Sequence, residues 1–323
     1  MLSFGERLAR AVAEKESMLV VGIDPRLERL PAPVLDASRR LYGESWEGAG
    51  NALLRFGQSV VEAVAPYAVA IKLQIAFYEM YGWWGLKAYA QIAAYARELG
   101  LLVIGDVKRG DIASTAEAYA RAHLGEVPLP SGRVTPALLN VDAVTINPYF
   151  GTDGIMPFLQ EASARGRGVF VLVRTSNNSA RELQDLRIEG TGELLWERVA
   201  RQVREWSVAL GEGSGAGQEG WSLLGAVVGA TYPQDLERAR ELLPGHWILV
   251  PGYGAQGATA QDAVRACRPG TGLGALVNAS RSVIYAYEEP RFMEGRKPSQ
   301  WARACADAAR AARDELRAAS RES

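Results

Sequence analysis

The sequence is poor in the residues that build disulfide frameworks and metal centres. It has two cysteines, Cys267 and Cys305, and two histidines, His123 and His246, among 323 residues. The cysteines lie far apart and neither has a histidine nearby, so we expect neither a disulfide framework nor a zinc site. His246 opens the apolar run that follows it, where a structural role at the start of a strand is the simpler interpretation. We therefore expect no metal site.

Long apolar runs and an excess of charge of one sign are also missing. No uncharged run approaches the ~18 apolar residues that a membrane-spanning helix needs. The N-terminal segment "MLSFGERLARAVAEKES" is amphipathic and lacks the apolar centre of a signal peptide. The net charge is −1, which gives no electrostatic basis for binding nucleic acid or an anionic membrane. We expect a soluble, cytoplasmic protein that binds neither.

What the sequence does contain is a regular alternation of apolar runs and helical patterns. Eight short runs are nearly continuous and rich in β-branched residues, which is typical of parallel strands covered on both faces. They are residues 18–24, 68–74, 101–108, 142–148, 168–176, 223–230, 247–252 and 273–280. Segments with apolar residues at helical spacing separate them. These are residues 51–67, 82–100, 113–125, 154–166, 193–210, 232–245 and 259–270, and a closing helix is expected at 301–320.

Eight strand–helix units and a closing helix predict an α/β fold, a (β/α)8 TIM barrel in which residues 1–323 form one domain. A doubly wound open sheet is the rival architecture, and the count of eight favours the barrel. Three stretches are interpreted as insertions, at 36–50, 126–140 and 211–220. The last is rich in Gly, Ser and Glu like a flexible linker, but the strand pattern continues beyond it, which favours a single domain.

Charged residues gather where the predicted strands end. Asp106 and Lys108 close the third strand and, being two apart, would share one face; Asp111 follows in the loop. Lys72 lies on the second strand and Asp24 ends the first. Active sites of TIM barrels form at the carboxyl ends of the strands, and buried lysines and aspartates need partners. A structural ion-pair cluster at the barrel top is the alternative, but the five charges together favour a site.

The last two predicted strands end in a pattern that suits a phosphate. The loop "PGYGAQG" has glycines, Gly254 among them, that let backbone N–H groups approach a ligand, and Gln256 could donate its amide. Arg281 follows the eighth strand and offers a bidentate fork. The alternative is a tight glycine turn. The loop also spells G-x-G-x-x-G, but no acidic residue follows ~20 positions later, so a dinucleotide site is not favoured.

The stretch "DVKRGDIAST" resembles the D-x-K-x-x-D signature of orotidine 5′-phosphate decarboxylases. With "GIDPR", "AIKLQIAFYE", "INPYFGTDG", "VRTSNNS", "PGYGAQG" and "NASRSVIYA" in this order, most of the chain is similar to the longer bacterial branch of that family. The resemblance implies a cofactor-independent lyase of pyrimidine biosynthesis that converts orotidine 5′-phosphate to UMP. It also implies a homodimer with shared active sites.

The resemblance implies a role for each matching residue. Lys108 would protonate C6 of the pyrimidine, and Asp106 would lie against the carboxylate of the substrate. Lys72 would belong to the same charged network and would help to hold the ribose hydroxyls. Asp111 would reach across a dimer interface to the ribose of the neighbouring site, where Thr115 would also lie.

The same resemblance assigns the rest of the nucleotide. Asp24 would hold ribose hydroxyls beside the lysine of the second strand. Ser176 would contact the amide edge of the base, with Thr175 and Asn177 as open alternatives. The 5′-phosphate would be held by Gln256 and Arg281.

Three other functions are weighed against this one. A Mg²⁺-dependent sugar-phosphate decarboxylase or synthase of the same superfamily is the main alternative, but "RTSN" and the uninterrupted Lys–Asp network count against it. A non-catalytic nucleotide sensor would not need both lysines and all the aspartates at the mouth. A Schiff-base aldolase could use Lys72 or Lys108.

Overall fold

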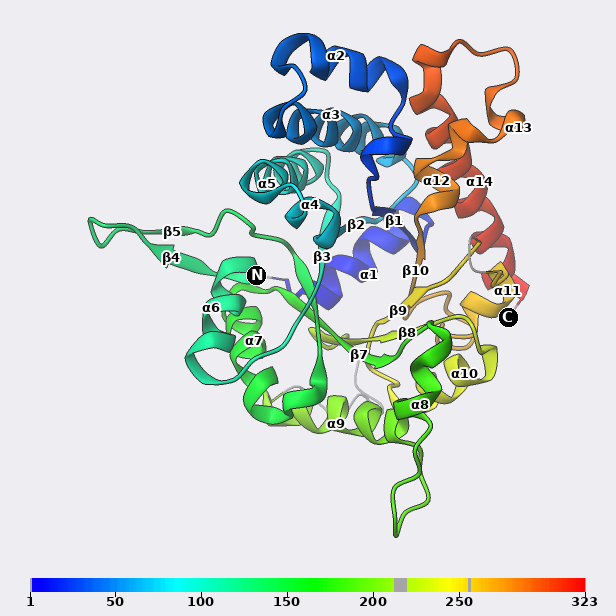
Figure 1. Ribbon diagram of the computed structural model, residues 1–323. Helices are drawn as coiled ribbons and strands as arrows, with labels where there is room; N and C mark the ends of the chain where they lie inside the picture. Colours follow the sequence, from blue (N-terminus) through cyan, green and yellow to red (C-terminus); the bar gives the residue numbers. More distant parts are fainter. Residues whose placement is uncertain (1, 212–219, 255–256, 323) are drawn as a thin grey trace.

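Eight parallel strands close into a barrel in the computed structural model, which describes residues 2–211, 220–254 and 257–322. Their order around the barrel is β1, β10, β9, β8, β7, β6, β3, β2. The strands are β1 (Leu19–Ile23), β2 (Ala70–Gln74), β3 (Leu102–Arg109), β6 (Ala143–Ile146), β7 (Gly168–Arg174), β8 (Leu224–Val228), β9 (Ile248–Pro251) and β10 (Ala275–Ala279). Each predicted apolar run overlaps one of them, so the predicted (β/α)8 barrel is confirmed (Figure 1).

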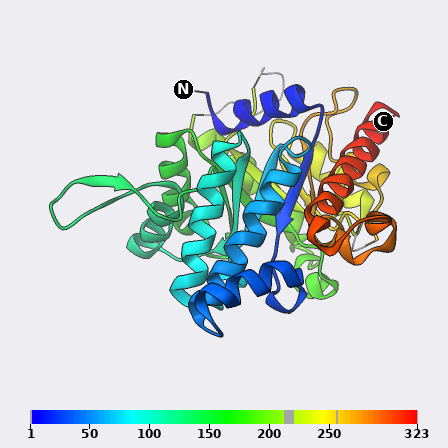
Figure 2. The same cartoon turned by 90° about the horizontal axis from the view of Figure 1, so that it is seen from above.

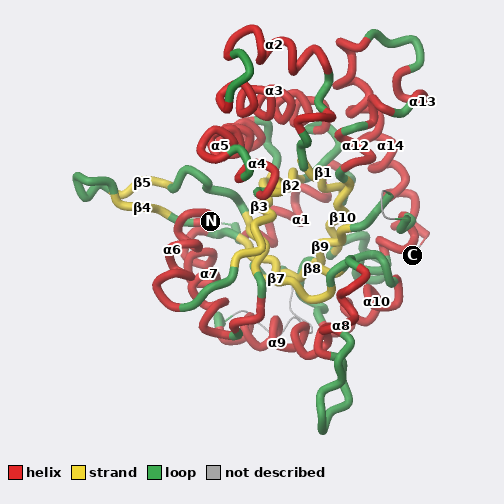
Figure 3. Tube along the Cα trace, viewed as in Figure 1, coloured by secondary structure: helices red, strands yellow, loops and turns green. Residues whose placement is uncertain are grey.

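Helices form a ring around these strands (Figure 3). Each predicted helical segment overlaps one of α3 (Trp46–Val64), α5 (Gly82–Glu98), α6 (Ala113–Leu124), α7 (Thr152–Arg165), α9 (Leu195–Ala209), α10 (Pro233–Leu242) and α11 (Ala260–Val264). The expected closing helix is α14 (Trp301–Glu322). Short helices near the strand ends are α4 (Ala76–Glu79), α8 (Arg181–Gln184), α12 (Arg281–Ile284) and α13 (Pro290–Met293). Within the described ranges, no helix combines the length and apolarity needed to cross a membrane.

The amphipathic N-terminal segment forms α1 (Phe4–Lys15), which lies across one end of the barrel (Figure 2). A capping box between Ser3 and Glu6 starts the helix. Its buried face, which includes Phe4 and Leu8, packs against the side chains that fill the barrel interior, such as Phe170. Burying each of these large side chains contributes ~1.5–3 kcal/mol. Because this end of the barrel is closed, a ligand has access from the carboxyl ends of the strands.

The three predicted insertions have different structures. Residues 36–50 fall largely in α2 (Ala32–Tyr42) and the start of α3. Residues 126–140 contain an antiparallel hairpin of β4 (Glu126–Pro128) and β5 (Val134–Pro136), which projects from the barrel (Figure 1). Most of 211–220 lies outside the described residues.

The end of β3 departs from regular strand geometry. Its pairing with β6 shifts register between Gly105 and Arg109. Lys108 adopts a left-handed backbone conformation, with φ at 46°. Asp106 and Lys108 were expected to share a face through simple strand alternation. Their side chains do face one cavity and meet there, although the strand that carries them is irregular at this point.

Candidate active site

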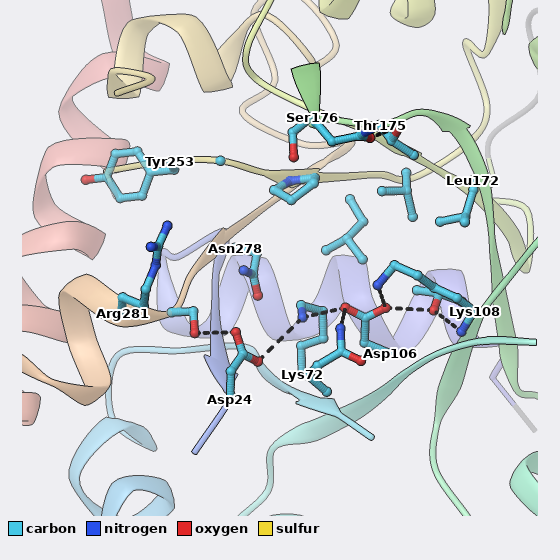
Figure 4. Close-up of a pocket in the computed structure, with 18 residues that line it drawn as sticks. Asp24, Lys72, Asp106, Lys108, Leu172, Thr175, Ser176, Tyr253, Asn278 and Arg281 are labelled. Carbon is cyan, nitrogen blue, oxygen red and sulfur yellow. Dashed lines mark hydrogen bonds and ion pairs between the residues drawn. The ribbon is translucent and has the colours of Figure 1, made fainter. Parts of the chain in front are cut away.

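A cavity of about 420 Å³ opens at the carboxyl ends of the strands (Figure 4). The residues that line it come from most strands of the barrel. They are Asp24, Lys72, Gln74, Asp106, Lys108, Thr145, Leu172, Thr175, Ser176, Asn177, Val227, Leu249, Pro251, Gly252, Tyr253, Asn278, Ser280 and Arg281. The structure thus brings together the charges predicted at the ends of strands one to three, the "TSN" loop and the arginine after strand eight.

Asp106 is the centre of the charged cluster. One carboxylate oxygen, Oδ2, accepts hydrogen bonds from Lys72 Nζ at 2.7 Å and Gln74 Nε2 at 2.9 Å. The other, Oδ1, accepts from Lys108 Nζ at 2.5 Å and Thr145 Oγ1 at 2.9 Å. Figure 4 shows the two lysines on either side of the carboxylate. Four donors around one carboxylate fix both its position and its charge.

The pKa values of the buried pair follow from this arrangement. Lys72 is 5% exposed and Asp106 is 6% exposed, so burial alone would favour the neutral form of each. Burial raises the pKa of Asp106, but attraction to Lys72 and Lys108 outweighs it and holds the pKa well below its usual value. Burial likewise lowers the pKa of Lys72, but Asp106 and Asp24 together bring a net rise. Both groups are therefore charged at neutral pH.

Thr145 ties the side chain of Asp106 to the backbone of Lys108. Its Oγ1 donates to Asp106 Oδ1 and accepts from the Lys108 backbone N–H at 3.0 Å. A left-handed conformation is unfavourable for a residue with a β-carbon. The threonine hydroxyl is thus one of the contacts that hold Lys108 in this conformation.

Asp24 keeps one oxygen available beside Lys72. Its Oδ2 accepts a hydrogen bond from Ser280 Oγ at 2.7 Å. Its Oδ1 lies 4.0 Å from Lys72 Nζ and is buried without a hydrogen-bond partner among the described residues. A buried carboxylate oxygen of this kind is suited to accept a hydrogen bond from a ligand hydroxyl.

The three candidate residues for contact with the base lie in the loop after β7 and differ in their hydrogen bonds. Thr175 Oγ1 donates to Asn177 Oδ1 at 2.7 Å and accepts from Gln184 Nε2 at 2.7 Å. Thr175 and Asn177 thus bind each other. Ser176 lines the same cavity, and its hydroxyl makes no hydrogen bond to the rest of the described chain.

The predicted phosphate end of the cavity is built from the loops after β9 and β10. Arg281 is the first residue of α12 and its side chain has no carboxylate partner within the described ranges. In Figure 4 it lies at the opposite end of the cavity from Lys108. Gly254, predicted to approach the ligand, is not among the residues that line the cavity, and its N–H donates to the carbonyl of Ala258 at 3.1 Å. The predicted contact of Gln256 lies outside the described residues.

Asp111 and Thr115 do not reach the cavity of their own chain. Asp111 Oδ1 accepts a hydrogen bond from the N–H of the next residue, Ile112. Thr115 is exposed near the start of α6, and Ile112 is 51% exposed. Residues 111–115 therefore expose polar groups and an apolar side chain on the surface, away from the cavity of their own chain. Arg109, just before this segment, forms an ion pair with Glu79.

Among the polar residues of the cavity that were not predicted from the sequence are three on the strands, Gln74, Thr145 and Asn278. Each is a polar side chain within or at the end of an otherwise apolar strand. Gln74 stands two positions after Lys72 and so shares its face. A search for single polar residues within the apolar runs would have found all three.

Together the closed barrel and its charged centre define a TIM-barrel enzyme whose cavity is lined by lysine and aspartate side chains. Residues 17–292 match the sequence profile of the orotidine 5′-phosphate decarboxylase / HUMPS family. The chain belongs to this family.

Individual relatives agree with the family match. The chain is 38% identical over 291 residues to an orotidine 5′-phosphate decarboxylase of Caldicellulosiruptor saccharolyticus, covering 89% of this chain and 91% of the relative. It is 38% identical to that of Rhodopirellula baltica, covering 97% of each. The solved structure of the Leishmania donovani OMP decarboxylase is similar with a TM-score of 0.70, at 30% identity and 99% coverage of both chains.

Proposed function

We propose that this protein removes CO₂ from orotidine 5′-phosphate and releases UMP, as a carboxy-lyase of pyrimidine biosynthesis. The observation that carries the proposal is the Asp106 carboxylate held between Lys72 and Lys108 at the base of the cavity, with Arg281 at the other end. A nucleotide monophosphate has a matching distribution of groups, because its anionic phosphate and its reacting base lie at opposite ends. The relatives at 38% identity carry the same named activity.

The chemistry requires a cation beside C6. Breaking the C6–carboxylate bond releases CO₂ and leaves the electron pair on C6. The Lys108 ammonium, held by Asp106 at 2.5 Å, stabilises this developing negative charge and then donates its proton to C6. The products are UMP and CO₂. The lysine regains its proton from solvent, so the cycle balances without an oxidant, reductant or cofactor.

Asp106 has two effects on the bound substrate. It fixes Lys108 in position, and it places a negative charge beside the carboxylate of the substrate, which disfavours the ground state. Apolar side chains of Leu172, Val227 and Leu249 also line the cavity, and they suit neutral CO₂ better than a carboxylate. Both features favour the decarboxylated product.

The remaining groups bind the parts of the nucleotide that do not react. Asp24 and Lys72 hold the ribose hydroxyls. Arg281 and Gln256 hold the 5′-phosphate. Ser176 contacts the amide edge of the base, a choice supported by the mutual hydrogen bond of Thr175 and Asn177. Binding energy from the phosphate helps to position C6 against the lysine.

The active enzyme is a homodimer in this proposal. Asp111 and Thr115 lie outside the cavity of their own chain, beside the exposed Ile112. They reach the ribose in the site of the partner subunit, so each site is shared. With this activity we expect the protein to work in the cytoplasm.

A Mg²⁺-dependent sugar-phosphate reaction is not favoured by the donor set. Both oxygens of Asp106 accept hydrogen bonds from lysine ammonium groups. A divalent cation at this carboxylate would lie beside two positive charges, which oppose its binding.

The test is to incubate the purified protein with orotidine 5′-phosphate and to follow both the loss of substrate absorbance and the formation of UMP by chromatography. We expect complete conversion, with the same rate after treatment with EDTA. A protein that binds UMP but leaves orotidine 5′-phosphate unchanged would contradict the proposal. Activity that EDTA abolishes would favour the metal-dependent alternative.

A further inference from the structure

Asn278 is a buried polar residue that the mechanism above does not use. It lies on β10, between apolar neighbours, and lines the cavity with only 8% of its surface exposed. Its side-chain oxygen Oδ1 is buried and has no hydrogen-bond partner in the described part of the chain. Leaving a buried amide oxygen without a partner is destabilising, so its presence in a ligand cavity calls for an explanation.

Gly22 provides the space that this side chain occupies. A Cβ atom at position 22 would lie 3.1 Å from Asn278 Oδ1 and 2.9 Å from Ser280 Cβ. Gly22 is also aligned with Lys72 in the pairing of β1 with β2. The missing side chain on β1 therefore makes room beside the backbone of Gly22 for the amide oxygen of Asn278 and for the side chain of Ser280.

A second buried oxygen without a hydrogen-bond partner among the described residues belongs to Asp24, two residues after Gly22. Asp24 Oδ1 is buried, lies 4.0 Å from Lys72 Nζ and accepts no hydrogen bond from the described residues, while Ser280 donates to Oδ2 of the same carboxylate. Asp24 follows β1, and β1 pairs with β10, the strand that carries Asn278. Strand β10 and the residue that follows β1 thus each present to one cavity an oxygen that accepts no hydrogen bond from the described residues. Each oxygen can accept a hydrogen bond from a ligand hydroxyl.

The position along the cavity identifies which part of the ligand this is. Figure 4 shows Asn278 between Arg281 at one end and the pair of Asp106 and Lys108 at the other. In a nucleotide, the group between the phosphate and the base is the sugar. We infer that Asn278 accepts a hydrogen bond from a ribose hydroxyl and makes the site selective for ribonucleotides over deoxyribonucleotides. This inference rests on the proposed function.

Binding of three nucleotides tests it: UMP, 2′-deoxy-UMP and 3′-deoxy-UMP, measured by calorimetry on the full chain. We expect the wild-type protein to bind UMP more tightly than both deoxy compounds. Two ratios describe the selectivity: the affinity for UMP relative to 2′-deoxy-UMP, and the affinity for UMP relative to 3′-deoxy-UMP. In Asn278→Ala, one of these two ratios should fall about 5- to 10-fold, the equivalent of one net hydrogen bond. The fall should come from weaker binding of UMP, because the corresponding deoxy compound has no hydroxyl to lose.

Two further variants make the result decisive. Asn278→Asp keeps an acceptor oxygen and should retain the ratio, so it tests the inference even if the alanine variant does not fold. Asn51→Ala makes the same chemical change on α3, outside the cavity, and should alter neither ratio. Unchanged ratios in Asn278→Ala, or equal losses for all three nucleotides, would overturn the inference. Failure of the wild-type protein to bind UMP would instead count against the proposed function.

Discussion

Lys108 donates a hydrogen bond to Asp106 at 2.5 Å from a left-handed backbone conformation, with φ at 46°. For a residue with a side chain such a conformation costs on the order of 1–3 kcal/mol and persists only where the surrounding contacts fix it. Here the contacts are the irregular end of β3 and the hydroxyl of Thr145. The strain is located at the group that we propose as the proton donor.

Replacing Thr145 by valine should lower kcat and leave KM almost unchanged. Valine keeps the shape but removes the hydroxyl that links Asp106 to the Lys108 backbone. Loss of a hydrogen bond to a charged group predicts a ~10- to 100-fold fall in kcat. Thr145→Ser should recover most of the activity. Steady-state kinetics with orotidine 5′-phosphate would refute a positioning role if valine and serine were equally impaired, or if valine had no effect.

Arg281→Ala should weaken the binding of UMP without weakening that of uridine. Arg281 lines the cavity and has no carboxylate partner in the described residues, so its charge is available to a phosphate. We expect a ~10- to 100-fold loss of UMP affinity in calorimetry. Arg291→Ala is the matched control, because that exposed arginine pairs with Glu289 outside the cavity. An equal loss for uridine would indicate damage to the cavity rather than loss of a phosphate contact.

The two histidines should remain neutral through the physiological pH range. Burial lowers the pKa of His123 to about 4 and that of His246 to about 3, from an ordinary value of 6.5. Their ring C–H signals in NMR should therefore not titrate between pH 8 and pH 5. As the pH falls, the histidines of the unfolded chain are protonated near pH 6.5, whereas those of the folded protein stay neutral. Protonation therefore favours the unfolded chain, and the free energy of unfolding should decrease as pH falls below about 6.5. A histidine that titrates near pH 6.5 would show that its ring is hydrated.

Mixing two inactive variants should restore activity if the sites are shared. Lys108→Ala removes the proton donor, and Asp111→Asn removes the residue that we place in the site of the partner subunit. A mixed dimer has one site with both changes and one with neither, so equal mixing should recover up to about a quarter of wild-type activity. Size-exclusion chromatography would confirm exchange of subunits. Efficient exchange without recovery would contradict the shared site.

The architecture was predictable because it depends on patterns that repeat along the chain. Eight apolar runs and their intervening helical spacings reflect burial on both faces of each strand, and burial dominates the folding free energy. The same patterns placed Asp24, Lys72 and Asp106 at one end of the barrel. These residues came together because parallel strands all end on the same side.

Local irregularities were not predictable in the same way. Nothing in "GDVKRGD" indicates that Lys108 leaves regular strand geometry, since the shift depends on its pairing with β6. The hairpin within 126–140 has strands of only three residues each, which are too short to show a clear alternation of apolar and polar residues. Thr145 and Asn278 were overlooked because a single polar residue does not change the pattern of an apolar strand.

The most direct measurement compares decarboxylation and UMP binding in Lys108→Ala. If the Lys108 ammonium protonates C6, kcat should fall by at least ~100-fold, the contribution of a positioned general acid. UMP affinity should change less than ~3-fold, because the phosphate, ribose and base contacts do not involve this ammonium. Lys87→Ala, a lysine packed over Trp84 outside the cavity, should leave both values unchanged. Near-normal turnover in Lys108→Ala would contradict the account.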